Sequence, residues 1–190
     1  MTEDNVIFCI IGPSGSGKST RVKNFMNNHA DICNLLVSDT TRPKREDEIN
    51  GKDYNFFSRE DFKLRNHVEN VCYNGNNYGL SKEEMDDKCS KKLITFFICD
   101  VEGYNVLNAL RNYKNIVGIY LQYPSSQCIR NMVNRGDNPS KIKDRVFYDC
   151  SIDAYTLDKK AYFNEVLTYQ PSWKKADKDF EEAVLKYVNI

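Results

Sequence analysis

The chain has 190 residues, which is enough for one domain with a sizeable buried core. Lysine plus arginine and aspartate plus glutamate each number 27, a balance that argues against a dedicated nucleic-acid binder, and no apolar run approaches the ~20 residues that span a bilayer. The acidic N-terminus is not typical of a signal peptide, and seven cysteines without a C-x-x-C pair predict neither a disulfide framework nor a zinc site, so we expect a cytoplasmic protein.

The N-terminal quarter begins with a continuous apolar run at residues 6–11. Such a run is typical of a strand that is buried on both faces of a parallel sheet. A glycine-punctuated loop at 12–19 follows and leads into a helix expected at 18–28. A second short strand is expected at 35–38, and the polar residues 39–53 are expected to form a loop.

The next segment contains two helix-start signals. Ser58 and Ser81 are each followed three residues later by an acid, which is the pattern of a capping box. The turn-rich triplet 74–76 between two strand-like runs indicates a hairpin. The expected elements are a strand at 54–57, a helix to about 66, hairpin strands at 68–73 and 77–80, and a helix to about 90.

The second half alternates strands with helices, which is typical of an α/β fold with a parallel sheet. Its first strand is wholly apolar and ends at Asp100. The segment 38–90 interrupts this alternation and therefore looks like an inserted subdomain. The expected elements are strands at 93–99, 116–121 and 166–168, and helices at 102–112, 125–135, 140–157 and 174–188.

A complete phosphate-binding motif, G-x-x-x-x-G-K-S, lies between the first strand and the first helix. Its glycines let backbone N–H groups turn toward phosphate oxygens, and the start of the helix adds partial positive charge. Lys18 is expected to reach the β- and γ-phosphates, and Ser19 to hold Mg²⁺. The expected ATP-binding residues are Gly12, Pro13, Ser14, Gly15, Ser16, Gly17, Lys18, Ser19 and Thr20.

A second block of motifs resembles the guanylate kinase family. It contains Ser38, then T-T-R-x-x-R ending at Arg45, and then an N-G-x-x-Y sequence ending at Tyr54. The resemblance covers about residues 5–150. It continues through Glu69, Tyr78-Gly79, Asp100-Val101-Glu102-Gly103 and Arg135-Gly136.

The resemblance implies a three-layer P-loop NTPase fold around a five-stranded parallel core. It also implies transfer of a phosphoryl group from ATP, assisted by Mg²⁺, to GMP or dGMP, in a monomer or homodimer that binds neither nucleic acid nor membrane. The implied single domain, 1–190, divides into a core of 1–37, 91–135 and 146–190, a monophosphate-binding subdomain at 38–90 and a lid at about 136–145.

The acceptor residues have a chemical logic of their own. Arg42 and Arg45 present planar forks that suit a dianionic phosphate, while Tyr54 and Tyr78 supply phenolic donors. The resemblance adds Ser38 as a further substrate-binding residue.

The carboxylate of Glu69 suits guanine because it accepts hydrogen bonds from N1–H and the 2-amino group together. Asp100 suits the 2-amino edge. Since Asp100 ends an apolar strand, it is also a candidate to hold Mg²⁺ through water.

The resemblance also assigns Arg135 and Arg145 to the lid, so the expected catalytic residues are Lys18, Arg42, Arg135 and Arg145. Two alternatives stay open: a kinase of another nucleotide or a sugar phosphate, and a non-catalytic binding module. The chain departs from the family pattern at Leu80, Ile98, Asn131 and Thr168, so the base preference and the rate stay open as well.

Overall fold

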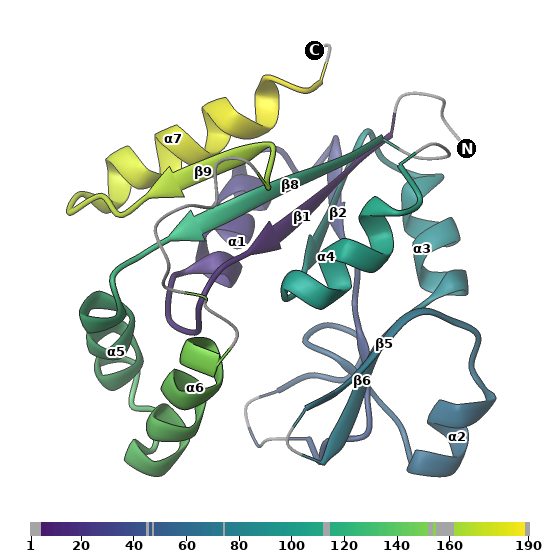
Figure 1. The fold of residues 1–190 in the computed structure, drawn as a ribbon. Helices are drawn as coiled ribbons and strands as arrows, with labels where there is room; N and C mark the ends of the chain where they lie inside the picture. Colours follow the sequence, from purple (N-terminus) through teal and green to yellow (C-terminus); the bar gives the residue numbers. More distant parts are fainter. Residues whose placement is uncertain are drawn as a thin grey trace. The chain divides into compact units, whose positions relative to one another are not determined.

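The structure is a computed structural model that describes residues 5–44, 46, 48–73, 75–111, 115–151, 154 and 162–188. Strands and helices alternate along most of the chain (Figure 1). The larger sheet has five strands in the order β2-β7-β1-β8-β9, which run over Cys33–Leu35, Ile94–Ile98, Val6–Ile11, Asn115–Gln122 and Glu165–Thr168.

The five-stranded sheet confirms the expected α/β architecture. Strand β2 pairs in parallel with β7, and β8 pairs in parallel with β9. All six residues of β1 are buried, as are seven of the eight residues of β8. Runs of this kind have no polar face to turn to water, which is why they occupy the inner strands of the sheet.

A smaller sheet has four strands in the order β4-β3-β6-β5. Strand β6 pairs antiparallel with both β3 and β5, and β3 pairs in parallel with β4. All four strands fall within the segment 38–90 that interrupts the alternation of strands and helices. They run over Asn55–Phe56, Asp39–Thr40, Asn76–Ser81 and His67–Tyr73.

The chain divides into two compact units. The first comprises 1–7 and 31–116, and the second comprises 8–30 and 117–190. The phosphate-binding loop lies in the second unit, and the residues expected to bind the monophosphate lie in the first.

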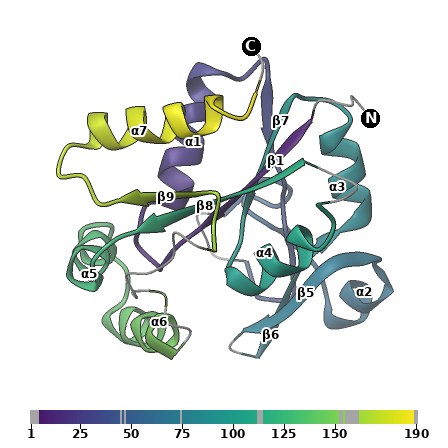
Figure 2. The same cartoon turned by 45° about the horizontal axis from the view of Figure 1, so that its top comes forward.

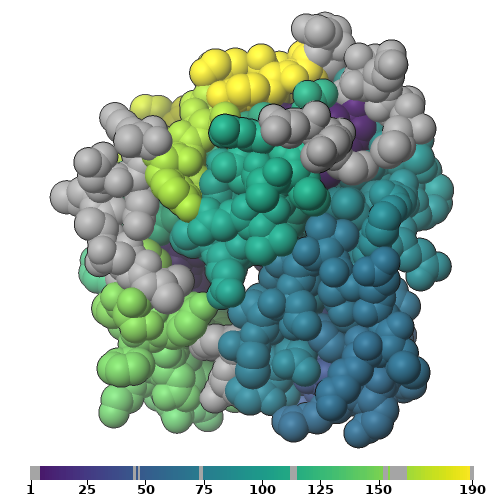
Figure 3. Space-filling view, turned by 45° about the vertical axis from the view of Figure 1, so that its right-hand side comes forward, coloured from purple at the N-terminus to yellow at the C-terminus, as the bar shows by residue number. Residues whose placement is uncertain are grey.

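Among its described residues, the first unit has three helices in addition to the smaller sheet. They are α2 (Arg59–Leu64), α3 (Lys82–Cys89) and α4 (Val101–Asn108). The serine half of each predicted capping box forms, because the Ser58 and Ser81 hydroxyls accept hydrogen bonds from backbone N–H groups three residues later. The two acids bond elsewhere, since Asp61 accepts from the Ser58 hydroxyl and Glu84 from the Val37 N–H. Helix α4 packs beside β5 (Figure 1), and α2 and the β5–β6 hairpin form one continuous blue mass in Figure 3.

The second unit contains four helices among its described residues: α1 (Lys18–Asn28), α5 (Ser125–Asn134), α6 (Pro139–Ser151) and α7 (Trp173–Leu185). Helix α7 packs along α1 and beside β9 (Figure 2). An ion pair ties the two helices together, since Arg21 Nη1 donates to Asp177 Oδ1 at 2.5 Å.

Several predicted boundaries were wrong. The strand expected at 35–38 runs over Cys33–Leu35, because its residues pair with Ile94, Thr95 and Phe96. The expected loop contains β3, whose two residues pair with Tyr78 and Gly79.

Helices were also misjudged at their ends. Helix α4 ends at Asn108 rather than at 112, and α7 ends at Leu185 rather than at 188. Helix α6 starts at Pro139, a favourable first helical position for proline. Its expected continuation to 157 falls largely on residues outside the described ones.

All seven cysteines are free of disulfides, and Cys72 and Cys150 are exposed. No helix among the described residues is long and apolar enough to cross a membrane.

Candidate functional site

The phosphate-binding loop in the second unit depends on glycine at close contacts. A Cβ atom at Gly12 would lie 2.7 Å from the carbonyl oxygen of Leu121, and one at Gly15 would lie 2.4 Å from that of Cys128. Both glycines have positive φ angles, of 148° and 80°. Gly17 also adopts a left-handed conformation, with φ of 91°, where it caps α1. Only glycine takes these positions without strain, so the loop keeps the shape of an anion cradle.

The polar groups of this loop fit a bound phosphate chain. Lys18 Nζ donates to the carbonyl oxygens of Gly12 at 2.7 Å and Pro13 at 3.1 Å, which folds the ammonium group over the loop. The Ser16 hydroxyl is fully buried and has no hydrogen-bond partner among the described residues. A buried hydroxyl of this kind calls for a ligand or a water.

Ser19 is the residue of this loop that was predicted to hold a metal ion. Ser19 is exposed in the first turn of α1, so its hydroxyl is accessible to a cation. No three His, Cys, Asp or Glu side chains in the described parts of the chain converge on a metal. That arrangement fits Mg²⁺, which is usually held by phosphate oxygens, water and one or two protein groups.

Two residues that hold the loop were not predicted. Asp149, which is buried in α6, accepts a hydrogen bond from the Ser14 backbone N–H at 2.8 Å. Asn131, in α5, donates from Nδ2 to the carbonyl oxygen of Gly15 at 2.8 Å. Both contacts join residues more than a hundred positions apart, so no local sequence pattern indicates them. A carboxylate therefore already engages one of the N–H groups expected to receive phosphate.

The two predicted lid arginines meet at one acid. Arg135 donates from Nε and Nη2 to Asp137 at 2.7 and 2.6 Å, and Arg145 donates from Nη1 to the same carboxylate at 2.8 Å. Gly136, with φ of 81°, makes the turn between α5 and α6 that brings them together. Because the side chain of Arg135 is 51% exposed, its ion pair contributes little and is easily exchanged for a phosphate.

In the first unit, Arg42 lies among aromatic rings and is held by Glu48. Its Nη1 and Nη2 donate to the two Glu48 oxygens at 3.0 and 2.6 Å. Partial burial opposes the charge of Arg42, but the hydrogen bond and charge of Glu48 outweigh it and raise the arginine pKa above its ordinary value. The guanidinium carbon lies 5.4 Å from the centre of the Tyr54 ring, which in turn is 5.9 Å from that of Tyr78. Three of the four arginines and tyrosines predicted to bind the phosphate group of the acceptor therefore cluster.

The fourth, Arg45, lies outside the described residues. Ser38 is half-buried immediately before β3, and its carbonyl oxygen accepts a hydrogen bond from the Asn55 N–H at 2.9 Å. Strand β3 is anchored by the fully buried Asp39, whose carboxylate accepts hydrogen bonds from Arg65 Nε at 2.5 Å and from Asn55 Nδ2 at 3.0 Å. This anchor fixes the backbone from which Ser38 and Arg42 project.

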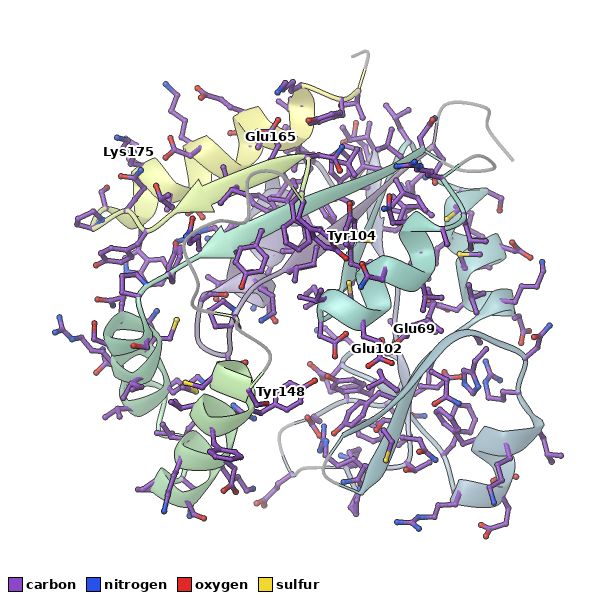
Figure 4. All side chains as sticks on the ribbon, in the orientation of Figure 1. Glu69, Glu102, Tyr104, Tyr148, Glu165 and Lys175 are labelled. Carbon is purple, nitrogen blue, oxygen red and sulfur yellow. The ribbon has the colours of Figure 1, made fainter. Side chains whose placement is uncertain are left out.

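Glu69 and Asp100, the predicted readers of guanine, also lie together. Glu69 is only 6% exposed on β5, and Asp100 caps α4 by accepting a hydrogen bond from the Gly103 N–H at 2.9 Å. A Cβ atom at Gly103 would lie 3.4 Å from Glu69 Oε1 and 3.5 Å from Asp100 Oδ1, so both carboxylates approach the same glycine. Figure 4 shows Glu102, from the first turn of α4, beside Glu69.

The crowding of these acids perturbs Glu69. Burial, and then the negative charges of Asp100 and Glu102, raise the pKa of Glu69 from 4.5 to about 7, against an opposing hydrogen bond from the Leu80 N–H. The Leu80 side chain is fully buried, and the neighbouring Ser81 hydroxyl accepts a hydrogen bond from Arg65 at 3.0 Å. A buried acid with a raised pKa and acidic neighbours is typical of a ligand-binding position.

Because its pKa is raised, we expect Glu69 to make the stability of the folded protein depend on pH. Between about pH 4.5 and 7 the folded state keeps a proton on Glu69 that the unfolded state releases, so the free energy of unfolding falls as the pH rises. At 1.36 kcal/mol per pKa unit, the wild type should lose roughly 2–3 kcal/mol relative to Glu69→Gln between pH 5 and pH 8. Urea denaturation of both proteins at the two pH values measures this. Parallel pH profiles would show that Glu69 titrates normally.

Comparisons with known proteins agree with the geometry. A sequence model of the family described as guanylate kinase matches residues 5–167. The guanylate kinase of Wigglesworthia glossinidia brevipalpis is 29% identical over 161 residues, which are 82% of this chain and 77% of that protein. The guanylate kinase of Clostridium tetani is 34% identical over 139 residues, which are 70% of this chain and 65% of that protein. The guanylate kinase of Sus scrofa is 36% identical over 118 residues, which are 60% of this chain and 59% of that protein.

A solved structure supports the fold. The crystal structure of guanylate kinase from Anaplasma phagocytophilum superposes with a TM-score of 0.67 at 22% identity, over 100% of this chain and 89% of that one. At this identity the likeness concerns the fold alone. The match of the family model extends over most of the chain, and it follows that this protein belongs to the guanylate kinase family.

Proposed function

We propose that this enzyme of the guanylate kinase family transfers the γ-phosphoryl group of ATP to GMP or dGMP, giving ADP and the nucleoside diphosphate. The observation that carries the choice of acceptor is the pairing of buried Glu69 with half-buried Asp100, because two carboxylates suit a base edge that presents two adjacent donors. Clustering of Arg42, Tyr54 and Tyr78 in the same unit supplies the matching phosphate site.

On the donor side, the loop N–H groups and Lys18 hold the triphosphate. Lys18 leaves the carbonyl oxygens of Gly12 and Pro13 for the β- and γ-phosphates. The phosphate also replaces Asp149 at the Ser14 N–H. Bound Mg²⁺ would neutralise charge on the phosphate oxygens, with Ser19, and Asp100 through water, as its protein ligands.

Arginines supply the remaining positive charge. Arg42 exchanges Glu48 for the acceptor phosphate. In this proposal Arg45 is the second arginine that binds the same phosphate. Arg135 and Arg145 exchange Asp137 for the phosphoryl group in transit. Each exchange is favourable because a phosphate carries more charge and more acceptor oxygens than a carboxylate. No covalent intermediate is needed, since catalysis of this kind works by positioning and charge stabilisation.

The enzyme recognises guanine through the hydrogen-bond donors of the base. Ionised Glu69 accepts hydrogen bonds from N1–H and the 2-amino group, and Asp100 accepts a further one from the 2-amino group. Adenine has an acceptor at N1 and would leave the carboxylates unpaired in a buried site, which costs a factor of about 10⁴ in comparable systems. The balanced charge of the chain supports nucleotides rather than nucleic acids as its partners.

An acceptor screen tests the proposal. ADP release from ATP and Mg²⁺ is followed with GMP, dGMP, AMP, CMP, UMP and dTMP, and with a sugar phosphate. We expect turnover with GMP and dGMP, and less than about a thousandth of that kcat/KM with AMP. Preference for another acceptor would favour a different kinase on the same scaffold. Binding of GMP with no ADP release would favour a non-catalytic module.

Replacing Arg42 with alanine should damage the acceptor side selectively. Loss of a charge-assisted bidentate pair is worth roughly 2–4 kcal/mol, so kcat/KM for GMP should fall by roughly 30- to 1000-fold while the KM for ATP changes little. The measurement is steady-state kinetics with each substrate varied in turn. Arg59→Ala is the matched control, because Arg59 is an exposed arginine of the same unit that binds the Gly75 carbonyl. Equal losses for both substrates would instead indicate a folding role.

A further inference from the structure

Trp173 is a half-exposed aromatic residue that lies against the phosphate-binding loop. The residue is 52% exposed, which is unusual for so large an apolar side chain. A Cβ atom at Gly17 would lie 3.7 Å from Cζ3 of the indole, so the ring lies next to the residue that precedes Lys18, at the distance where a side chain there would touch it. Both residues belong to the second unit.

The side chain of Arg21 covers one face of the indole ring. The guanidinium carbon of Arg21 lies 4.5 Å from the ring centre, and Arg21 itself is only 2% exposed. Arg21 Nη1 donates a hydrogen bond to Asp177 Oδ1 at 2.5 Å, which holds the guanidinium group in place. Asn24 Nδ2 donates to the second oxygen of the same carboxylate at 3.0 Å. Because Arg21 covers one face of the ring and about half of the side chain is exposed, part of the indole surface is left for a further contact.

The backbone of Trp173 is fixed as well. The preceding Ser172 caps α7, its hydroxyl accepting a hydrogen bond from the Lys175 N–H at 3.3 Å, and Trp173 is the first residue of the helix. Figure 4 labels Lys175 in this first turn. A large, flat apolar surface is thus held ready beside the loop at little further cost in conformational entropy.

A nucleoside triphosphate bound by this loop must place its base nearby. The phosphates occupy the N–H groups before and at the start of α1, so the sugar and base emerge next to the first turn of that helix. Every nucleobase has a flat π surface that stacks on aromatic side chains. The exposed indole surface beside Gly17 is therefore a suitable platform for a base tethered to phosphates at Lys18.

We propose that Trp173 stacks on the nucleobase of the phosphoryl donor. The inference rests on the proposed function, because it needs the donor triphosphate in the loop. Recognition by stacking depends on ring area rather than on the hydrogen-bonding edge of the base. The enzyme therefore tolerates GTP as a donor alongside ATP, in contrast to the strict reading of the acceptor by Glu69.

Fluorescence tests the contact directly, because Trp173 is the single tryptophan of the chain. Saturating ATP should quench and shift the emission of the full-length protein. Inorganic tripolyphosphate, which has the phosphates but no base, should leave it nearly unchanged at equal occupancy. Occupancy is measured independently by calorimetry. If the emission of Trp173 does not change when ATP fully occupies its site, the proposal is wrong.

Kinetics of three variants complete the test. Trp173→Leu should raise the KM for ATP by roughly 10- to 100-fold with kcat nearly unchanged, whereas Trp173→Phe, which keeps a ring, should lose only a few-fold. Affinity for tripolyphosphate should be the same in all of them. Tyr162→Leu, which removes another half-exposed aromatic ring of the same unit, is the control and should behave as wild type.

The outcomes separate the two claims. Equal loss of tripolyphosphate and ATP affinity in Trp173→Leu would mean that the indole only supports the loop, and the proposal would be wrong. GDP formation with an unchanged KM for ATP in that variant would overturn the stacking and leave the proposed function intact. Quenching by ATP without any GDP formation would support the stacking and overturn the proposed function.

Discussion

Replacing Lys18 with alanine is expected to lower kcat by about 10²–10³-fold or more, while the affinity for GMP stays within a few-fold of wild type. Lys18 is the one ammonium group of the phosphate loop, and its Nζ now binds the carbonyl oxygens of Gly12 and Pro13. Without it, charge that develops between the β- and γ-phosphates loses its nearest fixed cation. The predicted GMP-binding residues lie in the other unit and keep their own contacts.

Single-turnover kinetics and equilibrium binding of GMP measure the two effects separately. Lys23→Ala is the control, because Lys23 is an exposed lysine of the same helix and its loss should not matter. Thermal unfolding shows whether either variant is merely destabilised. A Lys18→Ala enzyme with nearly normal kcat would place the reacting phosphates elsewhere.

Glu69→Gln should lower kcat/KM for GMP by at least about 100-fold. The amide offers one acceptor where the carboxylate offers two, and its NH₂ group faces a donor edge of guanine, so a buried donor is left unpaired. The same logic gives the wild type a pH dependence. Because the pKa of Glu69 is about 7 in the free protein, kcat/KM for GMP should fall as the pH drops below that value.

Glu102→Gln provides the matched comparison for Glu69→Gln. It removes a neighbouring charge but leaves the reader of the base in place. Since Glu102 raises the pKa of Glu69, this variant should keep GMP activity and retain it to lower pH. The two profiles are obtained from initial rates between pH 5.5 and 8.5. If Glu69→Gln phosphorylates GMP as well as wild type does, another group reads the base, and the choice of acceptor must be revised.

Short-range features of the chain could be predicted from its sequence. The phosphate loop, the two serine caps and the buried strands β1 and β7 all follow from residues within one element or its immediate flank. The parallel sheet followed from the alternation of strands and helices. These features depend on local backbone geometry and on burial, which composition and spacing record directly.

Contacts between distant segments could not be predicted. Asp149 and Asn131 reach the phosphate loop from two helices far along the chain, and nothing near either residue indicates a partner. The Asp39 anchor of β3 depends in the same way on Arg65 and Asn55, in other elements. An acid is easily taken for a solvated surface group until the fold shows what it faces.

Short strands were the other weak point. The apolar triplet before Ser38 favoured a strand at 35–38, yet pairing with β7 sets the strand at Cys33–Leu35. The two-residue β3 carries no periodic signal at all, and it exists because β6 pairs with it. Pairing partners, rather than propensity, decide such elements.

The fate of the γ-phosphoryl group tests the central claim most directly. The enzyme is incubated with GMP, Mg²⁺ and ATP that carries an isotopic label in the γ-phosphoryl group, and the products are separated and counted. Transfer to GMP predicts that the label appears in the β-phosphate of GDP in a one-to-one ratio to ADP, with little inorganic phosphate. Label that appears mainly as inorganic phosphate, or that stays in ATP while both nucleotides are bound, would contradict the account.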